Sequence, residues 1–213
     1  MRAVGRWALW ALISMLVTMG LARATSLRWW RVPNDDPYLE ASIAPTLRGG
    51  DLVLLWRLTP PELGALVVCP EPKHAERLTI GRMVGEERNQ VLVEGSRITV
   101  AGRGFSSEGD CANSRFKVNS PQNGAEMELS CSMEAASGIL HKRGNAPATN
   151  DVPKLDLTLE EGEVALVSDN RRFPYDSRDF GAVQRELCTE TIFFRLVGAD
   201  GFFDADARFQ YIR

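Results

Sequence analysis

Ser42 is the first residue of this chain whose type and setting could do chemistry. It precedes Pro45, a Gly-Gly pair at residues 49–50 and an apolar run at residues 52–55. Pro45 fixes its own φ and biases Ala44 towards extended geometry, so the sequence predicts Ser42 on a stiff, non-helical segment that leads into a buried strand. A serine presented in this way can be a nucleophile when a general base and an oxyanion site lie beside it. Without them it is an ordinary turn serine.

Four short segments resemble, in order, the motifs of bacterial type I signal peptidases. Those motifs are S-M-x-P-T-L…G-D, G-D-I-V-V, K-R-V-V-G and G-D-N-R…D-S-R-x-x-G. The matching segments lie at residues 42–51, 64–68, 80–85 and 168–181. Each match is weak alone, but four in order over most of the chain make the resemblance specific.

The resemblance implies a membrane-bound serine endopeptidase fold that removes signal peptides from exported proteins. In this family a serine attacks the peptide bond, and a neutral lysine buried beside apolar atoms takes its proton. The nucleophile position falls on Ser42 and the lysine position on Gly81, which has no side chain. Arg82 is no substitute, because a guanidinium keeps its proton and neighbouring strand residues point to opposite faces.

Other positions of the family's site divide into two departures and three matches. Glu40 stands where a hydroxyl commonly completes the oxyanion hole, and its carboxylate would repel the developing charge. Pro174 stands where a serine orients the lysine, and it offers neither a hydroxyl nor an N–H. Asp169, Asp176 and Arg178 match, and the resemblance gives them the family's structural role of bracing the catalytic strands with buried charge pairs. Peptidase activity is therefore expected to be impaired.

Two alternatives to an impaired peptidase stay open. The first is an active signal peptidase with a displaced base, Lys73 or His74. His74 lies seven residues before Gly81, which is about 23 Å along an extended strand unless the loop folds back. The second is a non-enzymatic exported β domain with a structural role, cleaved after Ala24.

The N-terminus carries a hydrophobic segment. Residues 7–22 form an uncharged run of 16 residues closed by Arg23, slightly short of the ~17–25 residues that usually span a bilayer. A small-x-small site at residues 22–24 also fits a cleaved signal peptide. The family resemblance favours an anchor at residues 1–28, single-pass in the plasma (inner) membrane, with residues 29–213 on the extracytoplasmic, or periplasmic, side.

The rest of the chain predicts an all-β fold, with a barrel or sandwich as its core. Short runs rich in Val, Ile and Leu, separated by Gly-, Pro-, Asn- and Glu-rich breaks, predict strands. They lie at residues 52–56, 66–69, 78–84, 90–93, 97–100, 163–167, 191–197 and 208–212. The segment from about 102 to 156 is more polar and is expected to form the inserted second β lobe of larger family members, with a disordered excursion as the alternative.

Cysteine content and charge limit the chemistry further. Four cysteines in an exported chain allow three pairings, and the pair Cys111–Cys131 is expected within the insertion, with Cys69 and Cys188 either paired or free. No spacing suggests a metal site, and no cofactor is expected. A net charge of −3 without a basic stripe gives no hint of nucleic acid. The expected partners are signal peptides or other membrane-emergent polypeptides, membrane lipid, and an active signal peptidase paralogue.

Overall fold

The main sheet contains eight strands and is open at both ends. The structure, a computed structural model, describes residues 2–146 and 152–212. The strand order is β1-β2-β14-β3-β4-β12-β13, and β15 pairs with β14. Their bounds are β1 (Leu27–Arg31), β2 (Leu52–Trp56), β14 (Glu190–Val197), β3 (Leu66–Glu71), β4 (His74–Gly85), β12 (Glu163–Val167), β13 (Val183–Gln184) and β15 (Gln210–Tyr211).

Two smaller sheets and a few helices complete the described chain. One sheet has the order β10-β9-β8, from β8 (Ser106–Asn119), β9 (Glu126–Ala136) and β10 (Ile139–Gly144). The other has the order β11-β5-β6-β7, from β5 (Gln90–Glu94), β6 (Arg97–Val100), β7 (Arg103–Gly104) and β11 (Leu155–Thr158). The helices are α1 (Arg2–Ser26), α2 (Pro37–Ile43) and α3 (Ser177–Phe180), with 3₁₀ turns η1 (Arg185–Leu187) and η2 (Ala205–Ala207).

The all-β prediction is confirmed, and the barrel alternative is not. Strands β2, β6 and β12 begin and end at the predicted residues. In β2, Val53 and Leu55 are buried while their neighbours are half-buried, the alternation that a pleated strand imposes. The described strands of the main sheet do not close on themselves, because β1 and β13 remain edges.

The polar segment predicted as an insertion contributes strands to two sheets in its described part. Residues 106–144 form the three-stranded sheet, while β7 and β11 from the same segment join β5 and β6 instead. Residues 147–151 of the predicted insertion lie outside the described residues.

Strands β3 and β4 carry two different apolar clusters on their two faces. Ile80 packs with Leu39 and Ile43 of α2, so we call this side of β3–β4 the α2 face. Met83 and Leu166 pack with Phe180 of α3, Val67 and Cys69, and we call this side the α3 face. Because side chains alternate along a strand, neighbouring residues of β4 belong to opposite faces.

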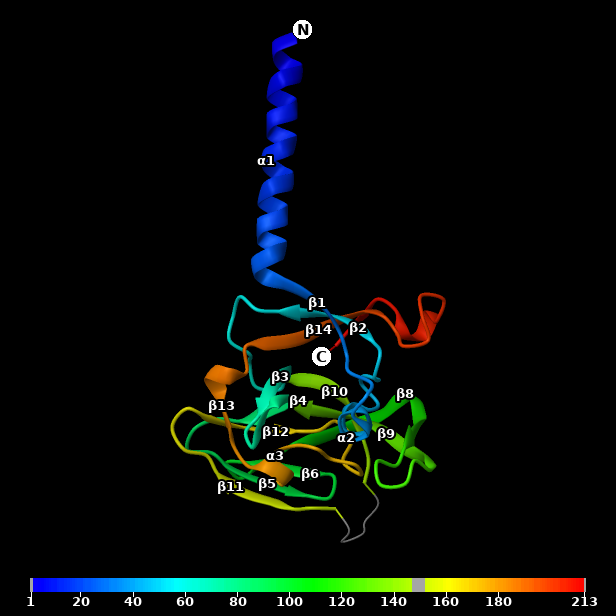
Figure 1. Cartoon of the computed structure of the whole chain (residues 1–213). Helices are drawn as coiled ribbons and strands as arrows, with labels where there is room; N and C mark the ends of the chain where they lie inside the picture. Colours follow the sequence, from blue (N-terminus) through cyan, green and yellow to red (C-terminus); the bar gives the residue numbers. More distant parts are fainter. Residues whose placement is uncertain (1, 147–151, 213) are drawn as a thin grey trace.

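Helix α1 stands away from the β body. Figure 1 shows it rising from the end of the molecule where β1, β2 and β14 lie. Between Trp7 and Leu21 its described side chains are exposed, with Trp7 77%, Leu16 55% and Leu21 62% accessible. In the part of the chain that the structure describes, no helix is long and apolar enough to cross a membrane, so the predicted spanning anchor is not found there.

The four cysteines form two disulfides, Cys111–Cys131 and Cys69–Cys188. Cys111–Cys131 links β8 to β9, which confirms the expected pair, and Cys69–Cys188 links β3 to the turn before β14. The first closes a loop with a sequence separation of 20 and the second one with a separation of 119. The second disulfide therefore restricts the unfolded chain more.

Removing the two disulfides separately should lower stability by different amounts. We expect Cys111→Ser with Cys131→Ser to cost about 3 kcal/mol, and Cys69→Ser with Cys188→Ser about 5 kcal/mol, because loop-closure entropy grows with loop length. Urea unfolding of the two double variants against the parent measures both losses. An equal loss, or a larger one for the Cys111–Cys131 pair, would contradict this ranking.

Candidate functional site

Ser42 lies inside α2, not on an extended segment as the sequence predicted. The helix begins because the Asp36 side chain accepts hydrogen bonds from the N–H groups of Tyr38 and Leu39, and because Pro37 has a helix-compatible φ. Pro45 biases only its immediate predecessor, Ala44, which caps the C-terminal end of α2 with extended geometry. The helix therefore has room to include Ser42.

The Ser42 side chain is fully buried. Its exposure is 0%, and Oγ donates a hydrogen bond to the carbonyl oxygen of Leu39 at 2.8 Å. Among the described residues this is the only hydrogen bond of the hydroxyl, and no lysine, histidine or carboxylate reaches it. A serine that attacks a peptide bond needs a base at about 2.6–3.2 Å from Oγ.

Asn170 holds the end of α2 that contains Ser42. Its backbone N–H donates to the Ser42 carbonyl at 2.9 Å, and its side-chain amide donates to the Ala41 carbonyl at 2.8 Å. Its side-chain oxygen accepts from the N–H groups of Arg172 and Phe173. The segment after β12 thus fixes α2 through one asparagine.

Asp169 forms a buried ion pair with Arg82. The guanidinium donates from Nε at 2.9 Å and from Nη2 at 3.1 Å, and its Nη1 donates to the Gly64 carbonyl. Thr46 donates to the second carboxylate oxygen at 2.5 Å. Burial raises the pKa of Asp169, but the charges of Arg82 and His141 and the hydrogen bonds from Arg82 and Thr46 together outweigh it, so this pKa lies below its ordinary value. The pair joins β4, the end of β12 and the segment after α2.

Asp176 and Arg178 form a second buried pair beside the first. Arg178 donates to both carboxylate oxygens at 2.9 Å and 2.7 Å. The backbone N–H of Ser168 donates to the same carboxylate at 2.7 Å. Burial raises the pKa of Asp176, and Arg178 with these hydrogen bonds brings it below its usual range. Asp176 also begins α3 as part of a capping box with Asp179.

A third charged cluster, which sequence reasoning missed, joins the three-stranded sheet to the core. Glu134 lies 2.5 Å from Arg171, 2.7 Å from Arg143 and 3.3 Å from Nε2 of His141. Neither ring nitrogen of His141 has a hydrogen-bond partner among the described residues. Backbone hydrogen bonds between Gly144 and residues 169–171 reinforce this junction. No motif marks these residues, and only strand alternation in β9 places Glu134 on the inward side.

The remaining predicted positions are spread out. Glu40 is exposed in the first turn of α2, and His74 is exposed beside Glu76 at 3.7 Å. Lys73 donates to the Asp179 carbonyl at 2.7 Å. Pro174 lines a surface pocket beside α2, which does not include Ser42.

Gly81 and Ser42 are not brought together. A Cβ built on Gly81 would lie 3.1 Å from the Leu166 Cβ, on the α3 face of β4. Ile80, the preceding residue, packs against Leu39 and Ile43 on the α2 face. A side chain at position 81 therefore starts out on the side of the sheet opposite α2.

The described part of the chain contains no cluster of side chains suited to bind a metal ion. No group of three or more His, Cys, Asp or Glu side chains that could hold an ion lies among residues 2–146 and 152–212.

A family model described as "Signal peptidase, peptidase S26" matches residues 5–197. No curated protein matches the chain.

Glu134 should set part of the acid stability of the protein. Burial raises its pKa, but Arg171, His141 and Arg143 bring it from 4.5 to about 2. A depressed pKa in the folded state means that the charged form adds stability above pH ~4.5, and that this stability is lost as the pH falls through about 2.

We therefore expect Glu134→Gln to destabilise the protein by about 3–5 kcal/mol at pH 7, because it leaves buried Arg171 without its partner. The decline in stability between pH ~4.5 and 2 should also become shallower. Denaturant unfolding at several pH values measures both effects. Glu128→Gln is the matched control, since Glu128 pairs with Arg115 on the exposed side of the same strand, and should cost less than about 1 kcal/mol. Equal effects of the two substitutions would contradict the expectation.

Proposed function

Because the chain belongs to the signal peptidase family, peptidase S26, we propose that it keeps the family's fold and peptide recognition but has little or no peptidase activity. One observation supports the proposal above the others. The Ser42 hydroxyl is completely buried, and its hydrogen is committed to the Leu39 carbonyl inside a helix. A nucleophile in that state neither meets a peptide bond nor has a group to take its proton.

The absence of a usable base follows from residue chemistry. Gly81 stands where the family has its lysine, and the next residue, Arg82, is a permanently charged guanidinium already paired with Asp169. Loss of the base from a hydroxyl nucleophile costs on the order of 10⁴–10⁶ in kcat. Nothing near Ser42 offers a compensating effect of that size.

The displaced-base alternative receives no support from the surroundings of Lys73 and His74. The Lys73 amine donates to the Asp179 carbonyl, and His74 is exposed beside Glu76. Neither side chain forms a hydrogen bond or an ion pair with α2 in the described chain. We therefore retain the impaired peptidase as the better proposal.

A chain that keeps the family's scaffold but lacks its peptidase chemistry would still be able to bind peptides. The buried Arg82–Asp169 and Asp176–Arg178 pairs maintain the segments around α2. We propose that the protein binds signal peptides or similar chains emerging from the membrane, or acts on an active signal peptidase paralogue. Signal peptides are the substrate class that family membership implies.

A membrane location belongs to the same proposal. Members of this family are membrane-associated, and α1, which rises away from most of the β body, exposes Trp7, Leu12, Leu16 and Leu21. Large exposed apolar surfaces require a partner. We propose that α1 holds the protein at the plasma (inner) membrane, with the β body on the extracytoplasmic side.

Purified full-length protein in detergent should fail to cleave a preprotein that carries an Ala-x-Ala site. The expected product level equals that of Ser42→Ala, because the hydroxyl has no base. Gly81→Lys should also add nothing, since the new side chain begins against Leu166 on the α3 face. Gel analysis of precursor and mature product over several hours provides the measurement.

The opposite result would be equally clear. Cleavage by the unmodified protein that disappears in Ser42→Ala would overturn the proposal and establish an active enzyme. Lys73→Ala and His74→Ala would then identify which of the two alternative bases acts.

A variant lacking residues 2–26 should leave the membrane fraction, whereas the full chain should stay in it through alkaline carbonate treatment. The reason is that α1 carries the exposed apolar side chains that we assign to the bilayer. Immunoblots of pellet and supernatant give the readout. Release of the intact full chain by carbonate would contradict anchoring through α1.

A further inference from the structure

A surface pocket of about 590 Å³ lies beside the start of α2 and is separate from Ser42. Tyr38, Phe173 and Tyr175 supply aromatic rings, and three prolines add further flat apolar surface. Two arginines, Arg77 and Arg172, and one acid, Asp179, also line it. We call this cavity the Arg172 pocket.

Arg172 is the residue whose bonding is incomplete. Its guanidinium lies over the Phe173 ring at 5.5 Å, which holds the side chain in place. Its Nε is buried and has no hydrogen-bond partner, and the guanidinium forms no ion pair with any described residue. A sheltered donor without a partner costs free energy. Nε itself is covered by the protein, so the outer nitrogens of the guanidinium are the donors that an anion in the pocket would meet.

The other charges at the pocket already have partners. Arg77 donates to Asp36 at 2.7 Å and lies 3.8 Å from Glu71. The Asp179 side chain accepts from the Asp176 N–H at 3.0 Å as part of the α3 capping box. Asp179 forms no ion pair with any described residue, so the pocket lining also carries one negative charge. Arg172 is the cation of the pocket without an ion-pair partner among the described residues, and a carboxylate matches it because guanidinium and carboxylate form bidentate bonds.

The hydrogen bonds of the pocket's backbone N–H groups indicate whether the ligand's carboxylate belongs to an acidic side chain or to a chain terminus. Capture of a C-terminal carboxylate generally uses a nest of free backbone N–H groups. Here the N–H groups of Arg172 and Phe173 donate to Asn170, and that of Tyr175 donates to Ser168. The guanidinium is thus the donor that remains, and one guanidinium suits the carboxylate of an acidic side chain.

We propose that the Arg172 pocket binds an extended peptide segment through an Asp or Glu side chain next to an apolar or proline residue. The acidic group binds Arg172, and the neighbouring residue packs on the aromatic and proline walls. Proline- and aromatic-lined grooves favour extended peptide backbones of this kind. The proposal does not depend on the proposed function, because it concerns binding at a surface that excludes Ser42.

Calorimetric titration of the full chain in detergent tests the proposal with three acetylated probe peptides. The first is Ac-Ala-Phe-Glu-Pro-Ala-Ala-NH₂, the second has Gln in place of Glu, and the third is the Gln peptide with a free C-terminal carboxylate. We expect the Glu peptide to bind at least about tenfold more tightly than both Gln peptides, as one charge-assisted bond allows.

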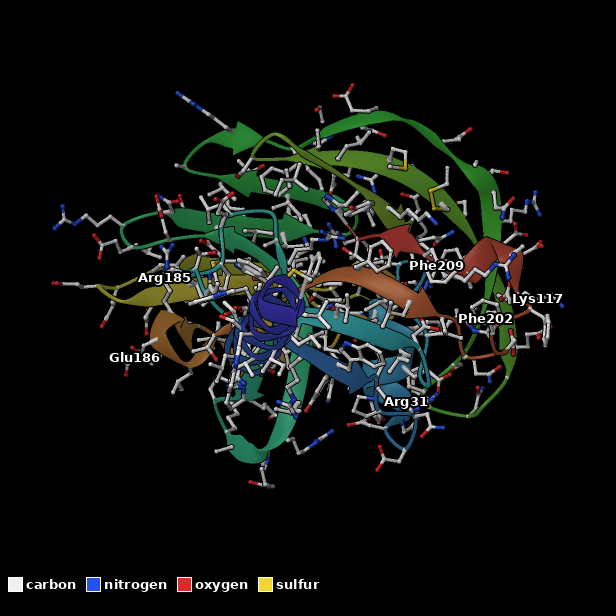
Figure 2. All side chains as sticks on the ribbon, turned by 90° about the horizontal axis from the view of Figure 1, so that it is seen from above. Arg31, Lys117, Arg185, Glu186, Phe202 and Phe209 are labelled. Carbon is white, nitrogen blue, oxygen red and sulfur yellow. A yellow bond between two sulfur atoms is a disulfide. The ribbon has the colours of Figure 1, made fainter. Side chains whose placement is uncertain are left out.

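Arg172→Gln should abolish that preference while leaving weak binding of the neutral peptide unchanged. Arg208→Gln is the matched control, because Arg208 also lies over a ring, that of Phe202 at 5.1 Å, but far along the C-terminal hairpin whose Phe202 and Phe209 are labelled in Figure 2. Tyr38→Ala should weaken the binding of the Glu peptide and of the Gln peptides by the same factor. Thermal unfolding by circular dichroism confirms that each variant is folded.

Three results would overturn the proposal. They are equal affinity for the Glu and Gln peptides, a preference that survives in Arg172→Gln, and no binding of any probe at millimolar concentration. Tighter binding of the free-carboxylate peptide would overturn the choice of an acidic side chain.

Discussion

The buried ion pair between Arg82 and Asp169 is the interaction on which the arrangement of this protein depends. Both side chains are shielded from water, so each charge is tolerable only because the other lies within 2.9 Å. Thr46 binds the same carboxylate, which ties in the segment that follows α2. Loss of either partner would leave a single charge buried at the meeting point of β4, β12 and α2.

Several other contacts radiate from this pair along the chain. Asn170, directly after Asp169, binds the carbonyls of Ala41 and Ser42, so the ion pair and the helix are fixed by consecutive residues. Arg171, next in sequence, binds Glu134 and thereby attaches the three-stranded sheet. The same few residues thus organise the core, the helix and the added sheet. None of these contacts uses the Ser42 hydroxyl or a side chain at position 81, so this arrangement does not depend on either.

Sequence alone could predict the elements whose pattern is local. Strands β2, β6 and β12 begin and end at the predicted residues, β2 with the period-two burial of a pleated strand, and Cys111–Cys131 lies within one short polar segment. Pro45 favours extended geometry before it and so hides helix α2 from sequence analysis, although Asp36 and Pro37 are a start signal. The face of the sheet to which a side chain at position 81 would point depends on how β4 pairs with β3 and β12. The Glu134 cluster depends on its contact with Arg171, 37 residues away in sequence. Neither can be read from a motif.

The central claim is that the side chain at position 42 is buried and has no base beside it, and thiol chemistry tests this most directly. All four native cysteines are disulfide-bonded, so Ser42→Cys would carry a single thiol, with Ser107→Cys on exposed β8 as the reference. The account predicts that iodoacetamide labels position 42 roughly a hundredfold more slowly than position 107, which corresponds to a local opening free energy of about 3 kcal/mol. It also predicts an apparent thiol pKa above the usual value of about 8.5. Labelling at a rate like that of position 107, with an apparent pKa below that value, would reveal an accessible side chain beside a base and contradict the account.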